Sequence, residues 1–80
     1  MIKLLTYQID NSKVTLYFQN NEKVEIYKFG LTEYVVTTDG ITKAAVKEIK
    51  DKLHKEGFDI DLSEFVGKEF LTYFENKLAQ

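Results

Sequence analysis

The chain has no cysteine, no proline, no tryptophan and no arginine among its 80 residues. Without cysteine it can form neither a disulfide nor a thiolate metal site. Without arginine it lacks the planar fork that binds guanine or phosphate in a bidentate way. No apolar run approaches the roughly twenty residues that cross a bilayer, and the first ten residues are too short and too alternating for a signal peptide. These absences favour a cytoplasmic protein with no membrane segment.

Catalytic and cofactor motifs are also missing. The single histidine, His54, has no serine or cysteine nucleophile at motif spacing. The segment that begins at Asp59 starts like a calcium loop, but Glu64 stands where glycine is required and Phe70 where glutamate is required. The four glycines are scattered, so no phosphate-binding loop is formed. We therefore expect no catalytic residue, no metal ligand and no cofactor, and we interpret the chain as a protein that is not an enzyme.

The first half of the chain has the alternation of half-buried strands. Val14, Leu16 and Phe18 alternate with polar or amphipathic residues, which is a period of two. A two-residue loop at Asn11–Ser12 and a three-residue loop at Gln19–Asn21 put the apolar residues of all three strands on one face. The pairs that follow are Ile9–Val14, Tyr7–Leu16, Leu5–Phe18, Leu16–Val24 and Val14–Ile26. A fourth strand is expected around Thr32–Thr38, which is rich in β-branched residues.

The second half has helical spacing. Apolar residues recur every four positions from Ile41 to Leu53, and Gly57 is suited to end the helix. Asp61 and Glu64 resemble a capping box at the start of a last helix. The sequence therefore predicts helices over about residues 40–56 and 62–78.

The predicted fold class is α+β, with a four-stranded, mainly antiparallel sheet made by residues 2–38 and the two helices packed on its apolar face. The 80 residues are sufficient for a single small globular domain, residues 1–80. The predicted core is Leu5, Ile9, Val14, Leu16, Phe18, Val24, Ile26, Ala45, Ile49, Leu53, Phe65, Val66, Phe70 and Tyr73.

The predicted last helix is unusually apolar. Its apolar arc is about twice as wide as an ordinary core-facing stripe. Such a helix contacts more than one neighbour, so either it wedges between the sheet and the first helix, or its excess is covered by another protein or by a second copy of the chain. We assign Leu71, Phe74 and Leu78 to this excess, and we add Tyr17 and Tyr27 on the open face of the sheet as further partner-binding residues.

A set of lysines indicates an alternative function, the binding of nucleic acid. The residues that fall on one stripe of the first predicted helix are Lys43, Lys47, Lys50 and His54. Such a stripe can contact phosphates while Tyr17 and Tyr27 stack on bases, although lysine is also common on solvated helix faces. The net charge of −2 and the lack of arginine disfavour nucleic acid as the partner.

The function that the sequence favours is non-enzymatic protein binding, as an inhibitor, adaptor or homodimeric regulator. A small nucleic-acid-binding accessory protein is the alternative. Small acidic α+β chains without cysteine are frequent among the accessory products of phages and mobile elements, many of which act by occupying the surface of a host protein. This last interpretation comes from the type of chain and has no motif behind it.

Overall fold

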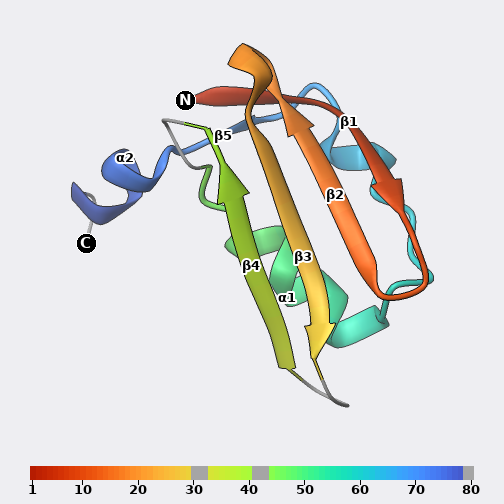
Figure 1. Cartoon of the computed structure of the whole chain (residues 1–80). Helices are drawn as coiled ribbons and strands as arrows, with labels where there is room; N and C mark the ends of the chain where they lie inside the picture. Colours follow the sequence, from red (N-terminus) through yellow and green to blue (C-terminus); the bar gives the residue numbers. More distant parts are fainter. Residues whose placement is uncertain (30–32, 41–43, 79–80) are drawn as a thin grey trace.

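The computed structural model describes residues 1–29, 33–40 and 44–78 (Figure 1). It is a small α+β fold in which five antiparallel strands form a curled sheet with two helices. The strands are β1 (Ile2–Ile9), β2 (Lys13–Phe18), β3 (Lys23–Phe29), β4 (Glu33–Asp39) and β5 (Glu69–Phe70). The helices are α1 (Lys47–Glu56) and α2 (Tyr73–Leu78), with short 3-10 turns at Gln19–Asn21 and Ser63–Phe65.

The sheet has one strand more than the sequence predicts. Its strand order is β4-β3-β2-β1-β5, so the chain returns after α1 to place β5 at the edge of β1. In this two-residue strand Glu69 pairs with Lys3, and Phe70 pairs with Ile2. The prediction of four strands was wrong because this short return has no alternation long enough to recognise.

The predicted hairpin registers are confirmed except at one end. Ile9 pairs with Val14 and Tyr7 with Leu16, and the two predicted pairs between β2 and β3 are also present. The exception is Phe18, which pairs with Leu4 instead of Leu5 because the register of β1 shifts between Leu4 and Thr6. The shift puts Leu4 in the core and leaves Leu5 exposed.

The first helix is shorter than predicted. Helix α1 begins at Lys47 rather than near residue 40, while its end at Gly57, which has a φ of 81°, is as predicted. The segment before α1 is extended, since Ala44 forms a β-bridge with Thr72 and the Ala45 N–H donates to the Leu71 carbonyl at 2.7 Å. Residues 41–43, which the prediction included in the helix, lie outside the described residues.

The prediction of one helix over residues 62–78 was wrong. Gly67 has a φ of +86°, a left-handed conformation that ends any helix running through it. Its N–H donates to the Leu4 carbonyl, and the Leu4 N–H donates to the carbonyl of Lys68. The edge of β1 thus provides backbone partners that draw the chain into an extended conformation, and only Tyr73–Leu78 returns to helix.

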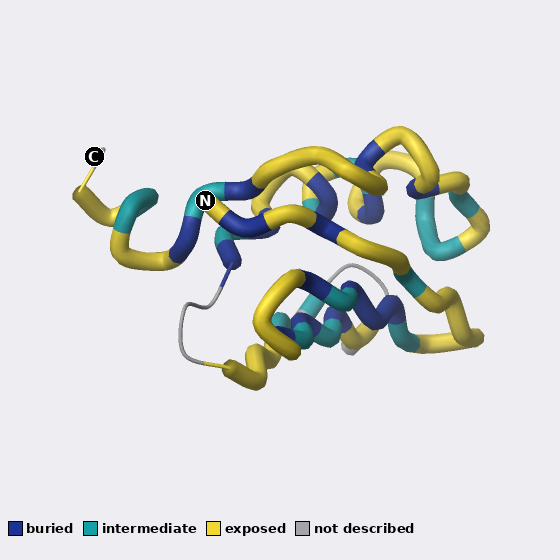
Figure 2. Tube along the Cα trace, turned by 90° about the horizontal axis from the view of Figure 1, so that it is seen from above, coloured by how far each residue is buried: buried dark blue, intermediate teal, exposed yellow. Residues whose placement is uncertain are grey.

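The core lies between the sheet and the layer that contains α1 (Figure 2). Ile49 and Leu53 of α1 are fully buried against it, and Tyr34 of β4 donates its hydroxyl to the Leu53 carbonyl at 3.2 Å. The buried hydrophobic residues are Ile2, Leu4, Val14, Leu16, Phe18, Val24, Ile26, Ala44, Val46, Ile49, Leu53, Leu62, Phe65 and Phe70.

Five members of the predicted core are placed differently. Leu5, Ile9, Val66 and Tyr73 are exposed, and Ala45 is only partly buried. The β1 register shift explains the exposure of Leu5, and the loss of the long helix explains that of Val66 and Tyr73.

Candidate protein-binding surface on the C-terminal helix

Helix α2 begins with a capping box. The Thr72 hydroxyl oxygen accepts a hydrogen bond from the Glu75 N–H at 3.3 Å, and Glu75 Oε1 accepts one from the Thr72 N–H at 3.2 Å. This reciprocal pair satisfies two of the N–H groups that a helix start leaves without intrahelical partners. The box defines where α2 begins and fixes its first turn.

The N-terminal amine also contributes to the start of α2. It donates a hydrogen bond to Glu75 Oε1 at 2.8 Å, which joins the two ends of the described chain. This bond, together with the hydrogen bonding of the carboxylate to Thr72, stabilises the charged form and lowers the pKa of Glu75 from 4.5 to about 2. Glu75 is therefore charged throughout the neutral range.

Beyond this start, α2 projects away from the sheet in both views (Figures 1 and 2). Its apolar side chains are open to solvent, with exposed fractions of 50% for Tyr73, 67% for Phe74 and 86% for Leu78. Phe74 and Leu78 are four residues apart and share one face of the helix. The rings of Tyr73 and Phe74 meet edge to face, with centroids 6.1 Å apart.

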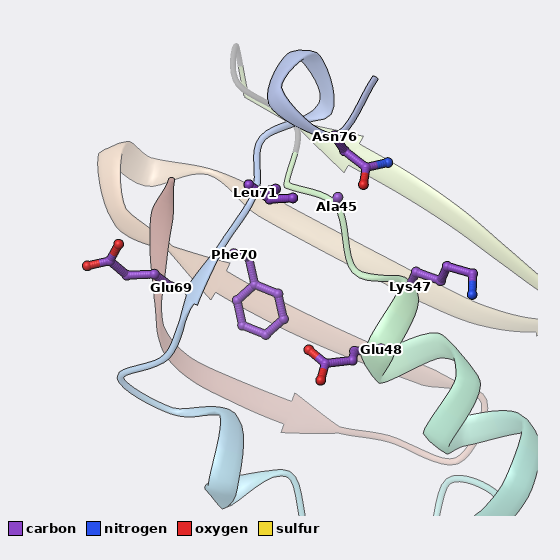
Figure 3. Close-up of a pocket in the computed structure, with 7 residues that line it drawn as sticks. All are labelled: Ala45, Lys47, Glu48, Glu69, Phe70, Leu71 and Asn76. Atoms are coloured by element: carbon purple, nitrogen blue, oxygen red, sulfur yellow. The ribbon is translucent and has the colours of Figure 1, made fainter. Parts of the chain in front are cut away.

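Two hollows flank the extended segment that holds α2. The smaller, about 230 Å³, lies between α1 and the Phe70–Leu71 segment (Figure 3). The larger, about 450 Å³, lies between β4 and α2 and is lined by Val36, Thr38, Ala44, Ala45, Val46, Lys47, Lys50, Tyr73 and Asn76. The larger hollow therefore lies on the side of α2 that carries Tyr73 and Asn76, and Phe74 and Leu78 do not line it.

The structure places the predicted partner-binding residues at three locations. Phe74 and Leu78 lie on α2, whereas Leu71 is partly buried and lines the smaller hollow (Figure 3). Tyr17 and Tyr27 lie on the sheet, four residues apart in register, because Tyr17 pairs with Lys23 and Tyr27 with Lys13. At about 3.3 Å per residue this separates the two tyrosines by roughly 13 Å.

Both sheet tyrosines have polar partners. The Tyr17 hydroxyl donates to Gln8 Oε1 and the Tyr27 hydroxyl donates to Glu25 Oε2, each at 3.1 Å. Lys13 forms an ion pair with Glu25 at 3.3 Å, which raises the pKa of Lys13 and lowers that of Glu25. This face of the sheet is therefore a network of polar and charged groups around rings, unlike the apolar surface of α2.

The predicted lysine stripe is only partly described. Lys43 lies outside the described residues. Lys47 forms an ion pair with Asp51 at 3.4 Å, Lys50 lines the larger hollow, and the His54 ring meets the Tyr34 ring edge to face with centroids 4.3 Å apart. The nucleic-acid alternative stays a prediction.

Across residues 1–29, 33–40 and 44–78, no group of three or more histidine, cysteine or acidic side chains could hold a metal ion. In the same part of the chain, no helix is long and apolar enough to cross a membrane. No family model matches the chain, and no curated protein or solved structure is significantly similar to it.

Sequence reasoning missed three features of this surface. The capping box is legible as Thr72-x-x-Glu75, but the assumed continuous helix hid it. Tyr73 was assigned to the core and is half exposed. The return of Leu71 beside Ala45 had no sequence signal, because it depends on a backbone hydrogen bond between distant segments.

Proposed function

We propose that the chain is a non-enzymatic protein-binding module of the cytoplasm, an inhibitor, adaptor or homodimeric regulator, that docks α2 on a partner. The observation that carries this proposal is the exposure of Phe74 and Leu78 on a helix that projects from the rest of the molecule. Apolar residues four apart on one helix face are the usual anchors of a helix that binds in an apolar groove. A partner that presents such a groove would cover both side chains together.

The size of α2 limits what it can contribute alone. Burying one large apolar side chain stabilises a complex by about 1.5–3 kcal/mol, while association costs about 4–15 kcal/mol in lost freedom. Phe74 and Leu78 therefore do not suffice, and the interface has to include neighbouring surface. The half-exposed ring of Tyr73, which meets the Phe74 ring edge to face, supplies further apolar area.

A six-residue helix is also too short to be stable in isolation. The capping box and the bond from the N-terminal amine hold its first turn, so the helix is already formed before a partner binds. A preformed binding element loses less conformational entropy on association than a disordered one. The network around Glu75 thus supports a binding role for α2.

The test compares three variants of α2. Phe74→Asp and Leu78→Asp place a carboxylate on the exposed apolar face, whereas the control Asn76→Asp places the same charge about 200° away around the helix. We expect proteins retained from the source cell by the wild-type chain and by the control to be lost with the first two variants. Each retained protein is then titrated in pure form against all four chains, where we expect the affinity to fall at least about tenfold, or 1.4 kcal/mol.

The same variants check that the fold is intact. Phe74 is exposed, so Phe74→Asp should change the free energy of unfolding by less than about 0.5 kcal/mol. A folded Phe74→Asp variant that binds a purified partner as tightly as the wild type refutes the proposal. Unfolding of that variant also refutes it, because the ring would then belong to the core.

A further inference from the structure

The sheet has an open edge at β4. This strand is the outermost in the order β4-β3-β2-β1-β5, and Figure 1 shows it in green at the side opposite β1. Between Glu33 and Asp39 its five residues carry no charge and include no proline. Long uncharged edge strands of this kind offer a template for pairing with another chain.

One hydrogen bond identifies which backbone groups point out of this edge. The Lys28 N–H donates to the Ser12 carbonyl at 3.0 Å, so the backbone of Lys28 faces β2. Successive residues of an antiparallel strand direct their N–H and C=O groups to opposite sides. Tyr27 and Glu25 therefore direct theirs toward β4.

The alternation continues into β4. Tyr27 pairs with Val35 and Glu25 with Thr37, so Val35 and Thr37 use their backbone groups within the sheet. Tyr34, Val36 and Thr38 consequently direct their N–H and C=O groups away from it. Among the residues that the structure describes, no backbone hydrogen bond joins these three residues to a segment outside the sheet.

We infer that β4 pairs antiparallel with β4 of a second copy of the chain, around a two-fold axis at Val36. In this register Tyr34 lies opposite Thr38 of the second copy, and Val36 lies opposite Val36. Each of these opposed pairs exchanges two hydrogen bonds, so every outward N–H and C=O of β4 is satisfied in both copies. The inference deepens the proposed function by naming a partner, although it rests on β4 rather than on α2.

A second copy fits this edge better than an unrelated strand for two reasons. One symmetric contact closes the open edge of both copies, which an unrelated strand does not do. The register also keeps residues of the same face opposite one another, so the layers that contain α1 lie on the same side of a continuous sheet.

The position of α2 supplies the area that a single strand lacks. A stable dimer buries about 1,200–2,000 Å² in total, more than a strand edge provides alone. Helix α2 lies on the same side of the molecule as the open edge and projects past the end of β4 (Figures 1 and 2). A second copy paired at β4 would extend toward it.

The ends of the strand limit the strength of this pairing. Glu33 of one copy lies opposite Asp39 of the other, and opposed like charges destabilise a strand pair. The alternative axis at Val35 avoids this contact but carries the outward groups of Thr38 past the first residue of β4 of the second copy. The axis at Val36 forms six hydrogen bonds between the two copies and the axis at Val35 forms four. One hydrogen bond is therefore gained for each of the two like-charge contacts, and it outweighs a contact of that kind.

The test measures hydrogen exchange at the backbone amides of the β4 edge. In isotope-labelled protein we expect the amides of Val36 and Thr38 to exchange with solvent at least about tenfold more slowly in concentrated than in dilute samples. Val35 and Thr37, whose amides are used within the sheet, should be protected at both concentrations. Light scattering should give the mass of two chains in the concentrated sample.

Thr38 provides a matched pair of variants. Thr38→Pro removes the outward N–H and is compatible with an edge strand, whereas Thr38→Ala removes the side chain but keeps the N–H. We expect Thr38→Pro to return the mass to that of one chain and Thr38→Ala to remain dimeric. Asp39→Asn removes the like-charge contacts and should tighten the dimer about three- to tenfold.

Three results overturn the inference. The first is a single-chain mass in concentrated wild-type protein, whether its Val36 and Thr38 amides are unprotected or protected. The second is a dimer that persists in Thr38→Pro, which places the contact elsewhere. The third is an Asp39→Asn variant whose two copies bind each other no more tightly than those of the wild type. This third test remains decisive even if Thr38→Pro fails to fold. A Phe74→Asp variant that stays dimeric with protected edge amides would refute α2 docking within the dimer and leave β4 pairing standing.

Discussion

The two edges of the sheet differ in whether another segment of the chain covers them. At the β1 edge, Ile2 and Lys3 pair with β5, and Leu4 exchanges backbone hydrogen bonds with the Gly67–Lys68 segment. At the β4 edge, the outward groups of Tyr34, Val36 and Thr38 have no backbone partner within the described part of the chain. The segment that covers one edge thus comes from the C-terminal third, and the other edge is left open.

The C-terminal segment that covers the β1 edge has a buried part and an exposed part. Phe70 meets Phe18 edge to face at 5.6 Å and is buried, whereas Phe74, four residues later, is 67% exposed. The first part of this segment completes the core, and the last turn lies outside it. The C-terminal segment therefore uses Phe70 to cover the β1 edge and the core, and the rings that follow it are not needed there and stay exposed.

The largest expected effect is on the covered edge. Phe70→Ala removes a buried ring that contacts Phe18 and Phe65, and we expect a loss of about 3–5 kcal/mol in the free energy of unfolding. A chain of this length has a total of only about 4–12 kcal/mol, so the variant should be close to unfolded. Chemical denaturation measures the difference.

The matched control for that change is Phe74→Ala, the same truncation at an exposed ring. We expect it to alter the free energy of unfolding by less than about 0.5 kcal/mol. Equal effects of the two variants would contradict the division of the C-terminal segment into a core part and an exposed part.

The next effect concerns the turn that leads into the covered edge. Gly67 has a φ of +86° and a Cβ placed there would meet no atom within 4 Å, so any cost of substitution is backbone strain alone. We expect Gly67→Ala to destabilise the fold by about 1–2 kcal/mol, measured by thermal unfolding. Gly67→Asn should cost less, because asparagine tolerates the left-handed region; an Asn variant as unstable as the Ala variant would contradict this reading.

The difference between the edges also explains how much the sequence could predict. The registers of β2 with β1 and β3 follow from alternation and short turns, since a slip of one residue would expose Val14 and Leu16. The covering of β1 follows from no local pattern, because residues 67–70 are fixed by backbone bonds to a strand more than sixty positions away. The apolar spacing of residues 62–78 suits a helix, and Gly67 was the one residue in it that disfavours a helix.

The sequence predicted exposed apolar side chains on the C-terminal segment, but from a helix that does not form, and their role in binding stays a prediction. The excess of apolar residues near the C-terminus suggested Phe74 and Leu78, which the structure leaves exposed on α2. The reasoning assumed a continuous helix, whereas the exposure follows from a short helix held at one end. Tyr17 and Tyr27 were added as residues of the open sheet face, and they lie on β2 and β3.

The smallest expected effect is confined to the start of α2. The hydrogen bonds from the N-terminal amine and Thr72 lower the pKa of Glu75 from 4.5 to about 2, so the charged carboxylate stabilises the folded state. That contribution is complete above pH 4.5 and is lost as the pH falls toward 2. We therefore expect the amide resonances of Thr72 and Glu75 to shift over this range, as the first turn of α2 loosens.

Glu75→Gln separates the charge from the cap. Its amide oxygen still accepts the hydrogen bond from the Thr72 N–H, but it has no charge to attract the N-terminal amine. We expect the variant to keep a formed first turn with a weakened contact to Met1, and to lose the resonance shift between pH 4.5 and 2. A variant that titrates like the wild type would assign the transition to another carboxylate, and α2 would then be held by Thr72 and by the bond between Leu71 and Ala45 instead.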